Sequence, residues 1–245
     1  MSRLRFLAIA LVLPTLGVAE SSRVEVVVAL PAPDSQQAIR RLQLALAEQG
    51  CEARTDYSDP GYAAPDSPTT LTFRYQEREG LAPPADLIAV NRKGELPVPV
   101  WVTRRTAGVR TLAELEDRDL AVVADDDPIG ARQPLAALAE AGVRWAPGQI
   151  YQTQDFGSAV SLLLHNNTHA AASEQGLVGA YLDNQGLEMI WQGEPVRLGG
   201  WYRGAEVEAA VAVDTCLAAL QKLDRDSYPQ AFRAFPEWIH SFRMP

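Results

Sequence analysis

The sequence is poor in the residues that usually carry redox, metal or nucleic-acid chemistry. Its 245 residues include only two cysteines and three histidines, and 22 basic side chains stand against 31 acidic ones. Binding to nucleic-acid phosphates or to an anionic membrane surface depends on clustered Lys and Arg, so a net charge of −9 disfavours both partners. Two cysteines make neither a disulfide scaffold nor a structural zinc site. The 47% hydrophobic content is nevertheless ample for a sizeable buried core.

Long apolar runs are also absent, and no stretch approaches the 18 residues that suggest a transmembrane helix. The N-terminus has a different pattern, because Arg3 and Arg5 precede an apolar run, 6–13, and small residues follow as far as Ala19. This pattern is typical of a secretory signal peptide, here 1–19, cleaved near Ala19. No cysteine follows the cleavage point, so no lipid anchor is indicated. We therefore expect a periplasmic protein without a membrane anchor, and a monomer.

Cys51 and Cys216 are the only pair available for a disulfide. An exported protein meets an oxidising compartment, where such a pair can close a bridge across a long loop. The alternative is that both are buried thiols that pack as small hydrophobic groups. The spacing alone leaves both readings open.

Short apolar segments and helical patterns alternate along the chain. Strands are expected at 24–30, 51–55, 71–75, 86–91, 120–124, 149–152, 170–173 and 187–191. Helices are expected from Asp34 or Ser35 to Gly50 and at 112–115, 133–141, 158–165, 177–182 and 215–223. Two prolines make 96–103 an edge strand or a connection, and 207–213 reads as a helix or a strand.

This order predicts an α/β protein of two lobes, with the second lobe inserted into the first. Lobe one is expected at 20–101 and 199–245, and lobe two at 102–198, with crossings near Val100 and Leu198. Ligands of open α/β sheets bind beyond the carboxyl ends of the strands. A small molecule would then be enclosed in a cleft that opens and closes at the crossings.

Three stretches resemble the phosphonate and phosphite (PhnD-like) family among the type 2 periplasmic solute-binding proteins. They are 102–123, which is similar to a crossing strand, a short helix and a strand, then Gly130 and Pro134 at the family's spacing, and 151–174. The resemblance covers mainly 97–185. It implies the two-lobe periplasmic-binding-protein type 2 fold and a ligand-binding role beside an ABC transporter.

The sequence departs from that family where the ligand would sit. The family has a Ser/Thr-rich turn, whose hydroxyls and backbone amides at a helix N-terminus hold an oxyanion. Here Asp127, Pro128 and Ile129 occupy the turn. A carboxylate only accepts hydrogen bonds and Pro128 has no amide hydrogen, so a dianionic phosphonate is disfavoured and an altered pocket is predicted. The stretch 154–157 likewise replaces the family's His-Asp pair.

The predicted ligand-binding residues all lie where a strand ends or a helix begins. They are Asp34, Ser35, Arg74, Tyr75, Asp127, Gly130, Ala131, Arg132, Tyr151, Thr153 and Gln154. Arg132 has two readings, since it can hold a ligand carboxylate or lie on the surface of its helix.

Two groups raise the question of a metal. The acidic turn 125–127 can coordinate a hard cation, face an amine ligand, or simply cap the helix that follows. His165 and His169 have the i, i+4 spacing of metal ligands, but Asn166 and Asn167 between them indicate a helix end. We therefore predict neither a metal nor another cofactor.

The common catalytic motifs Gly-x-Ser-x-Gly, Ser-x-x-Lys and His-Glu-x-x-His are absent, so an enzyme is not expected. The function predicted is an extracytoplasmic protein that closes two lobes on a small molecule for an ABC permease. The alternatives are a ligand-sensing domain that serves a sensor kinase, and a periplasmic metal carrier or enzyme.

Overall fold

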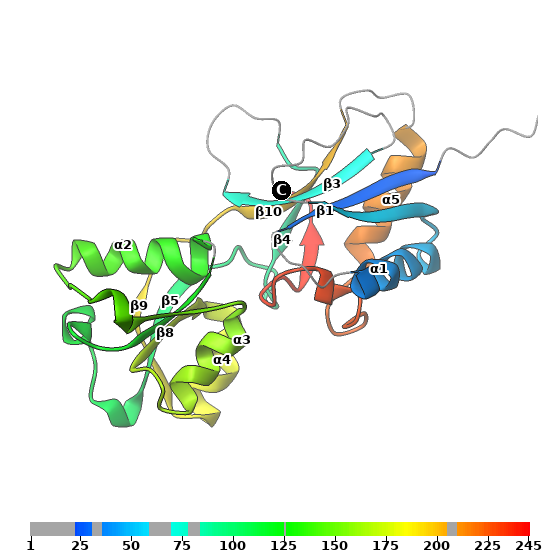
Figure 1. Cartoon of the computed structure of the whole chain (residues 1–245). Coiled ribbons are helices and arrows are strands. Elements are labelled where there is room, and N and C mark those ends of the chain that lie inside the picture. Colours follow the sequence, from blue (N-terminus) through cyan, green and yellow to red (C-terminus); the bar gives the residue numbers. More distant parts are fainter. Residues whose placement is uncertain (1–22, 31–35, 59–69, 78–83, 125, 205–209) are drawn as a thin grey trace, which may run out of the picture.

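The computed structural model describes residues 23–30, 36–58, 70–77, 84–124, 126–204 and 210–245. They form two α/β lobes, each built on its own sheet, and two extended segments of chain connect them (Figure 1). One segment runs from β4 to β5 and the other from β9 to β10, so lobe two is an insertion in lobe one. The predicted α/β class and the insertion are confirmed.

Lobe one holds a six-stranded sheet in the order β11-β4-β10-β3-β1-β2. Strands β1 and β2 flank helix α1 in sequence and pair in parallel, β3 is parallel to β1, and β10 is antiparallel to β3 and β4. The elements of this lobe are β1 (Val24–Ala29), α1 (Gln36–Glu48), β2 (Ala53–Ser58), β3 (Thr70–Glu77), β4 (Leu87–Val90), β10 (Leu198–Arg203), α5 (Ala210–Lys222), η5 (Phe232–Ala234) and β11 (Ser241–Arg243).

Lobe two holds a five-stranded sheet in the order β7-β6-β8-β5-β9. Strand β6 is parallel to β7 and β8, whereas β5 is antiparallel to β8 and β9. Its elements are β5 (Pro99–Arg104), η1 (Arg105–Ala107), η2 (Leu112–Leu115), β6 (Leu120–Val123), η3 (Pro128–Arg132), α2 (Gln133–Glu140), η4 (Pro147–Gln149), β7 (Ile150–Thr153), α3 (Phe156–Leu164), β8 (Ala170–Glu174), α4 (Gln175–Asn184) and β9 (Leu187–Gln192).

The expectation that 96–103 is an edge strand or a connection is wrong, because β5 lies inside its sheet between β8 and β9. Its prolines are tolerated for a simple reason. Pro99 is the first residue of the strand, and both prolines act only as acceptors: the amide of Gly193 donates to the Pro99 carbonyl and that of Val196 to the Pro97 carbonyl.

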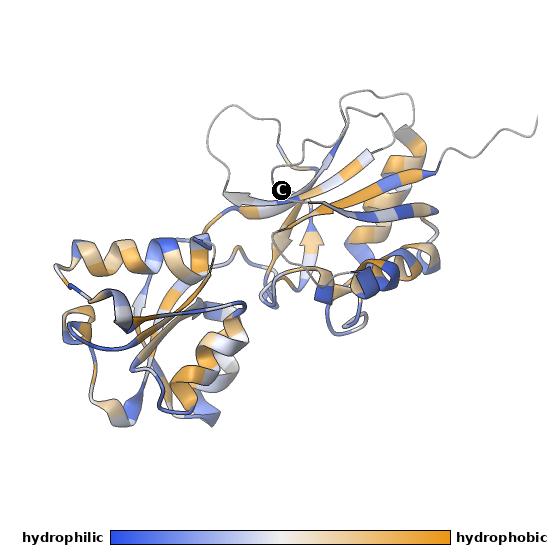
Figure 2. Cartoon of the chain, in the orientation of Figure 1, coloured by the Kyte–Doolittle hydropathy of each residue, from blue (hydrophilic) through white to orange (hydrophobic). Residues whose placement is uncertain are grey.

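The helices bury one face and expose the other, as their sequence pattern predicts. Helix α1 buries Ile39, Leu42 and Leu46 and leaves charged residues outside, so its outer face is hydrophilic in Figure 2. Hydrophobic colour follows the central strands of both sheets in the same figure.

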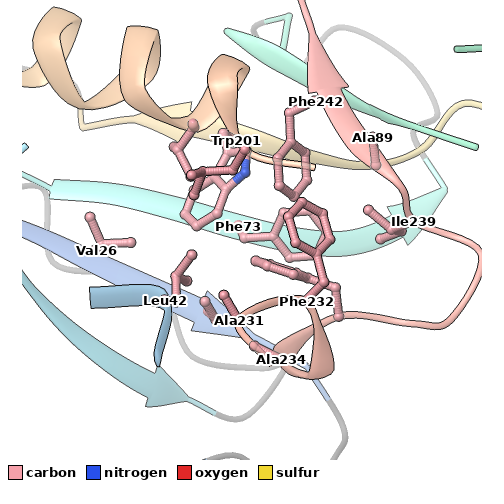
Figure 3. Packing of buried hydrophobic residues seen from close by; sticks show 14 of the residues in the cluster. Val26, Leu42, Phe73, Ala89, Trp201, Ala231, Phe232, Ala234, Ile239 and Phe242 are labelled. Carbon is pink, nitrogen blue, oxygen red and sulfur yellow. The ribbon is translucent and has the colours of Figure 1, made fainter. Parts of the chain in front are cut away.

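An aromatic cluster fastens the C-terminal segment to the lobe-one sheet. Phe73 of β3 and Trp201 of β10 pack edge-to-face, with ring centroids 5.4 Å apart, and the ring of Phe242 lies 5.8 Å from that of Phe73 (Figure 3). The ring of Phe235 lies 5.0 Å from that of Phe73. Such pairs each add about 0.5–1.5 kcal/mol beyond the burial of their surface. The segment between η5 and β11 is therefore held at both ends, which matters for the site.

Cys51 and Cys216 form a disulfide, with their Cα atoms 4.8 Å apart. It joins the segment before β2 to helix α5, 165 residues away in sequence. Of the two readings left open by the sequence, the bridge is the one observed, and it agrees with the export that the N-terminus predicts.

Replacing both cysteines by serine should lower the free energy of unfolding by about 2–4 kcal/mol, because the unfolded chain regains the freedom of a long loop. For a chain of this length the melting temperature should fall by roughly 5–15 °C, measured by calorimetry. Reduction of the unchanged protein with dithiothreitol is the control and should produce a similar fall. Equal melting temperatures in all samples would mean that the bridge constrains nothing.

Candidate functional site between the lobes

A buried carboxylate stands at the start of the first long helix of lobe two. Asp127 is 9% exposed, and its Oδ1 accepts hydrogen bonds from the backbone amides of Ile129 at 2.9 Å and Gly130 at 2.6 Å. The chain then makes one π-helical turn, in which the amide of Arg132 donates to the Asp127 carbonyl, before α2 begins. The amides that could have held a ligand oxyanion at this turn are thus taken by the protein's own side chain.

The other oxygen of Asp127 reaches across to lobe one. The Tyr75 hydroxyl donates to Asp127 Oδ2 at 2.8 Å and accepts from Trp238 Nε1 at 3.1 Å. Tyr75 comes from the end of β3 and Trp238 from the C-terminal segment, so this chain of hydrogen bonds joins three distant parts of the sequence. A network in which each polar atom has a partner is stable in a low-dielectric setting.

Burial changes the acidity of both groups. Burial raises the pKa of Asp127, although the bonds from Gly130, Tyr75 and Ile129 and the charge of Arg132 oppose it. Burial and then the negative charge of Asp127 raise the pKa of Tyr75 well above its usual value. The phenol therefore stays protonated and remains the donor in this pair.

A second carboxylate, this time from lobe one, contacts lobe two. Glu237, in the C-terminal segment of lobe one, accepts the backbone amide of Gly157 at 2.7 Å through Oε2. Gly157 lies in the first turn of α3, where Asp155 caps the amide of Ser158 at 2.6 Å. Burial raises the pKa of Glu237 and nearby Asp155 adds to the effect, while the Gly157 amide and Arg225 oppose it.

Arg225 holds the segment that carries Glu237 and Trp238. Its Nε donates to the Ile239 carbonyl at 2.7 Å, and its Nη2 donates to the carbonyls of Pro236 at 2.6 Å and Phe235 at 3.3 Å. Burial lowers the pKa of Arg225 to about 10, so the guanidinium remains charged at neutral pH. The segment is therefore positioned by bonds to its backbone rather than by its side chains alone.

A third polar contact lies at the crossing between the lobes. Asn91 follows β4, and its Nδ2 donates to Oε1 of Glu174, the fully buried last residue of β8, at 3.0 Å. Glu174 also accepts the amides of Val98 at 3.4 Å and Leu177 at 2.8 Å. The crossing segment is thus tied to the lobe-two sheet by one carboxylate.

Apolar groups complete the contact between the lobes. Val123, Ile129 and Phe156 of lobe two belong to the same buried cluster as the lobe-one core. Gly130 is needed beside them, because a β-carbon there would lie 2.6 Å from Val123 Cβ and 3.0 Å from a ring carbon of Phe156. Close packing explains why this position is a glycine.

The structure brings together some of the predicted ligand-binding residues and separates others. Tyr75, Asp127 and Gly130 gather at the lobe contact. Arg74 does not join them, because successive strand residues face opposite ways; its guanidinium lies 5.5 Å from the ring centre of Tyr202. Asp34 and Ser35 fall outside the described residues.

The remaining predicted residues differ in their surroundings. Ala131 is buried in the lobe-two core, and Arg132 has a guanidinium nitrogen 3.7 Å from a carboxylate oxygen of Asp126. Tyr151 and Gln154 are exposed. The Thr153 hydroxyl donates to the carbonyls of Val122 and Asp155, and so shapes the turn into α3.

The possible metal ligands are dispersed in the part of the chain that the structure describes, where no group of three His, Cys, Asp or Glu side chains could hold an ion. Asp125 lies outside that part. Helix α3 ends at Leu164 and Asn166 is left-handed, as the sequence predicts for a helix end, and His169 Nδ1 accepts the Asp119 amide at 3.2 Å.

The sequence pattern does not single out Glu237, Trp238 or Glu174 as site residues. The tail 232–242 reads only as aromatic-rich, and nothing in its local pattern indicates that it would reach the other lobe. In the sequence, Glu174 is only the acidic residue that ends the stretch 151–174.

Comparison with known proteins defines the fold but not a family. The sequence matches no protein-family model and no curated protein. Among solved structures, PhnD1 of Prochlorococcus marinus, solved in complex with methylphosphonate, superposes with a TM-score of 0.60 at 16% identity, over 91% of this chain and 92% of that one. A protein of Xanthomonas citri solved with chloride gives a TM-score of 0.58 at 11% identity, over 92% of each chain.

A binding-protein component of a phosphonate ABC transporter from Pseudomonas aeruginosa gives 0.54 at 9% identity, over 91% of this chain and 81% of that one. The chain therefore has the fold of the type 2 periplasmic binding proteins, the fold that phosphonate-binding proteins share.

Replacing Tyr75 by phenylalanine should cost about 1–3 kcal/mol of unfolding free energy, because the buried Asp127 Oδ2 and Trp238 Nε1 both lose their partner. Urea denaturation measures the loss. Tyr151→Phe, on an exposed tyrosine, is the matched control and should change the value by less than about 0.5 kcal/mol. Equal losses in the two variants would contradict the network.

Replacing Asp127 by asparagine should change the pH dependence of stability. The raised pKa means that the contribution of this carboxyl is fully present below its ordinary value of 3.8 and is lost as the pH rises through the folded-state pKa. The variant should therefore gain stability relative to the unchanged protein as the pH rises from 4 to 8, in urea titrations at each pH. Glu140→Gln, on an exposed carboxylate, should show no such trend, and a difference that is constant with pH would contradict the shift.

Proposed function

We propose that this protein is an extracytoplasmic solute-binding protein that encloses a small molecule between its two lobes and presents the closed form to an ABC-type permease. The observation that carries the proposal is the bond between Tyr75 and Asp127, which joins the lobes at the carboxyl ends of strands β3 and β6. Ligands of open α/β sheets bind at that edge.

The two lobes and their two crossings support a binding role, since hinged closure on a ligand needs only a few residues that absorb the motion. The groups at the lobe contact are carboxylates, amides, a phenol and an indole, and their hydrogen bonds are largely with one another. Such a set orients and encloses a molecule without bond chemistry, so we propose binding rather than catalysis.

The ligand proposed is neutral or positively charged where it meets lobe two. Asp127 already takes the amides of Ile129 and Gly130, and Glu237 takes that of Gly157. A dianionic phosphonate placed there would face two carboxylates instead of free donors. An amine or a polar neutral group could instead donate to those carboxylates and pack on Trp238.

The test is a thermal-shift screen of the chain from Glu20 onward against amino acids, polyamines, divalent metals, phosphate, sulfate and methylphosphonate. A ligand present at one hundred times its dissociation constant adds about 2.7 kcal/mol to stability, so a shift of roughly 5–10 °C is expected. Amines should produce it and methylphosphonate should not.

The variant Asp127→Ala should then lower the affinity for the ligand found, whereas Glu140→Gln should leave it unchanged. A shift with methylphosphonate or phosphate would overturn the proposed charge of the ligand and keep the binding role. A screen in which no compound class shifts the melting temperature would count against the binding role itself.

A further inference from the structure

The contact made by Glu237 differs from an ordinary helix cap. Helix α3 already has a local cap in Asp155, whose side chain takes the Ser158 amide. Glu237 lies 80 residues from Gly157 in sequence and belongs to the other lobe (Figure 1). Its carboxylate nevertheless accepts the amide of Gly157, which directly precedes Ser158 at the same helix end. A carboxylate brought from another lobe to a helix N-terminus stands where a free anionic ligand would stand.

The glycine at position 157 leaves room for this carboxylate. A β-carbon at position 157 would lie 2.9 Å from Glu237 Oε1 and 3.6 Å from Asp155 Oδ1. The helix end is therefore shaped to admit the side chain of Glu237 against its backbone. Gly176 has the same relation to the crossing, since a β-carbon there would lie 3.1 Å from Asn91 Nδ2.

The C-terminal segment that contains Glu237, between η5 and β11, is fixed by contacts within lobe one. Arg225 bonds to three backbone carbonyls between Phe235 and Ile239, and its guanidinium lies 5.6 Å from the ring centre of Phe232. Phe235 and Phe242, which precede and follow Glu237 in sequence, pack edge-to-face in the aromatic cluster with ring centroids 5.2 Å apart. Lobe one therefore fixes the position of the Glu237 carboxylate. When lobe two moves toward lobe one, the N-terminus of α3 meets this carboxylate.

From these contacts we infer that the chain carries a built-in latch: Glu237 docks on the N-terminus of α3 and, together with the Tyr75–Asp127 bond, holds the lobes closed without any bound ligand. The inference deepens the proposed function, because it names what holds the closed state. Three polar contacts, at Asp127, Glu237 and Glu174, lie between the lobes or at their crossing, and each is made by groups of the protein itself. A ligand then changes the closed population only by its own preference between the two states.

Small-angle X-ray scattering of the ligand-free chain from Glu20 onward tests the latch. The unchanged protein should scatter as the closed structure does. Glu237→Ala should increase the radius of gyration by about 1 Å or more over the roughly 17 Å expected of a compact chain of this length. Glu140→Gln, an exposed carboxylate on lobe two, is the matched control and should leave the curve unchanged.

Two variants of similar size provide a readout that a loss of packing would not move. Glu237→Gln keeps an acceptor oxygen for the Gly157 amide and should stay compact. Glu237→Met keeps the size of the side chain without an oxygen acceptor and should expand as Glu237→Ala does.

Two results would overturn the latch: a ligand-free protein that already scatters as an open form, or a Glu237→Ala variant as compact as the unchanged protein. Expansion of Glu237→Ala together with a compact Glu237→Met would assign the opening to lost packing and overturn the role of the carboxylate. These measurements need no ligand, so the thermal-shift screen can fail while the latch stands, and the reverse also holds.

Discussion

One buried carboxylate, Asp127, couples a local turn of lobe two to the contact between the lobes. One oxygen of Asp127 accepts hydrogen bonds from the amides of Ile129 and Gly130, where the π-helical turn starts. The other oxygen accepts a hydrogen bond from the Tyr75 hydroxyl of the opposite lobe. Because burial of a charged carboxylate is unfavourable unless its oxygens are satisfied, the local turn and the closed arrangement depend on each other. Trp238 extends the same network into the C-terminal segment.

The C-terminal segment gives lobe one its part in that arrangement. Its aromatic residues pack on the sheet, and Arg225 binds its backbone carbonyls. Glu237 is thereby placed against lobe two, while Trp238 donates to Tyr75 of lobe one. In both lobe-two helix ends at the contact, backbone amides are taken by carboxylates of the protein, Gly130 by Asp127 and Gly157 by Glu237. Free amides at a helix N-terminus favour a negative charge, and here that charge belongs to the protein's own side chains.

Much of the architecture could be read from local pattern. Apolar runs, turn residues and helix ends predicted the five α-helices and most of the strands, because these signals depend on neighbours in sequence. They did not predict β10 or β11. The place of β5 could not be read, since prolines at the start of a strand look the same whether the strand lies at the edge or inside. The sequence predicts both Arg74 and Tyr75 as ligand-binding residues. Because successive side chains of a strand face opposite ways, only Tyr75 lies at the lobe contact.

The sequence by itself determined the α/β class, the inserted second lobe, and the presence of a carboxylate, Asp127, at the turn before the first long helix of lobe two. It also supplied the two cysteines without deciding whether they would bridge. The tertiary structure alone decided that Cys51 meets Cys216 and that Glu237 meets Gly157. The physical reason is separation along the chain: contacts between residues 80 or 165 positions apart follow from how whole elements pack, and no local pattern encodes that packing.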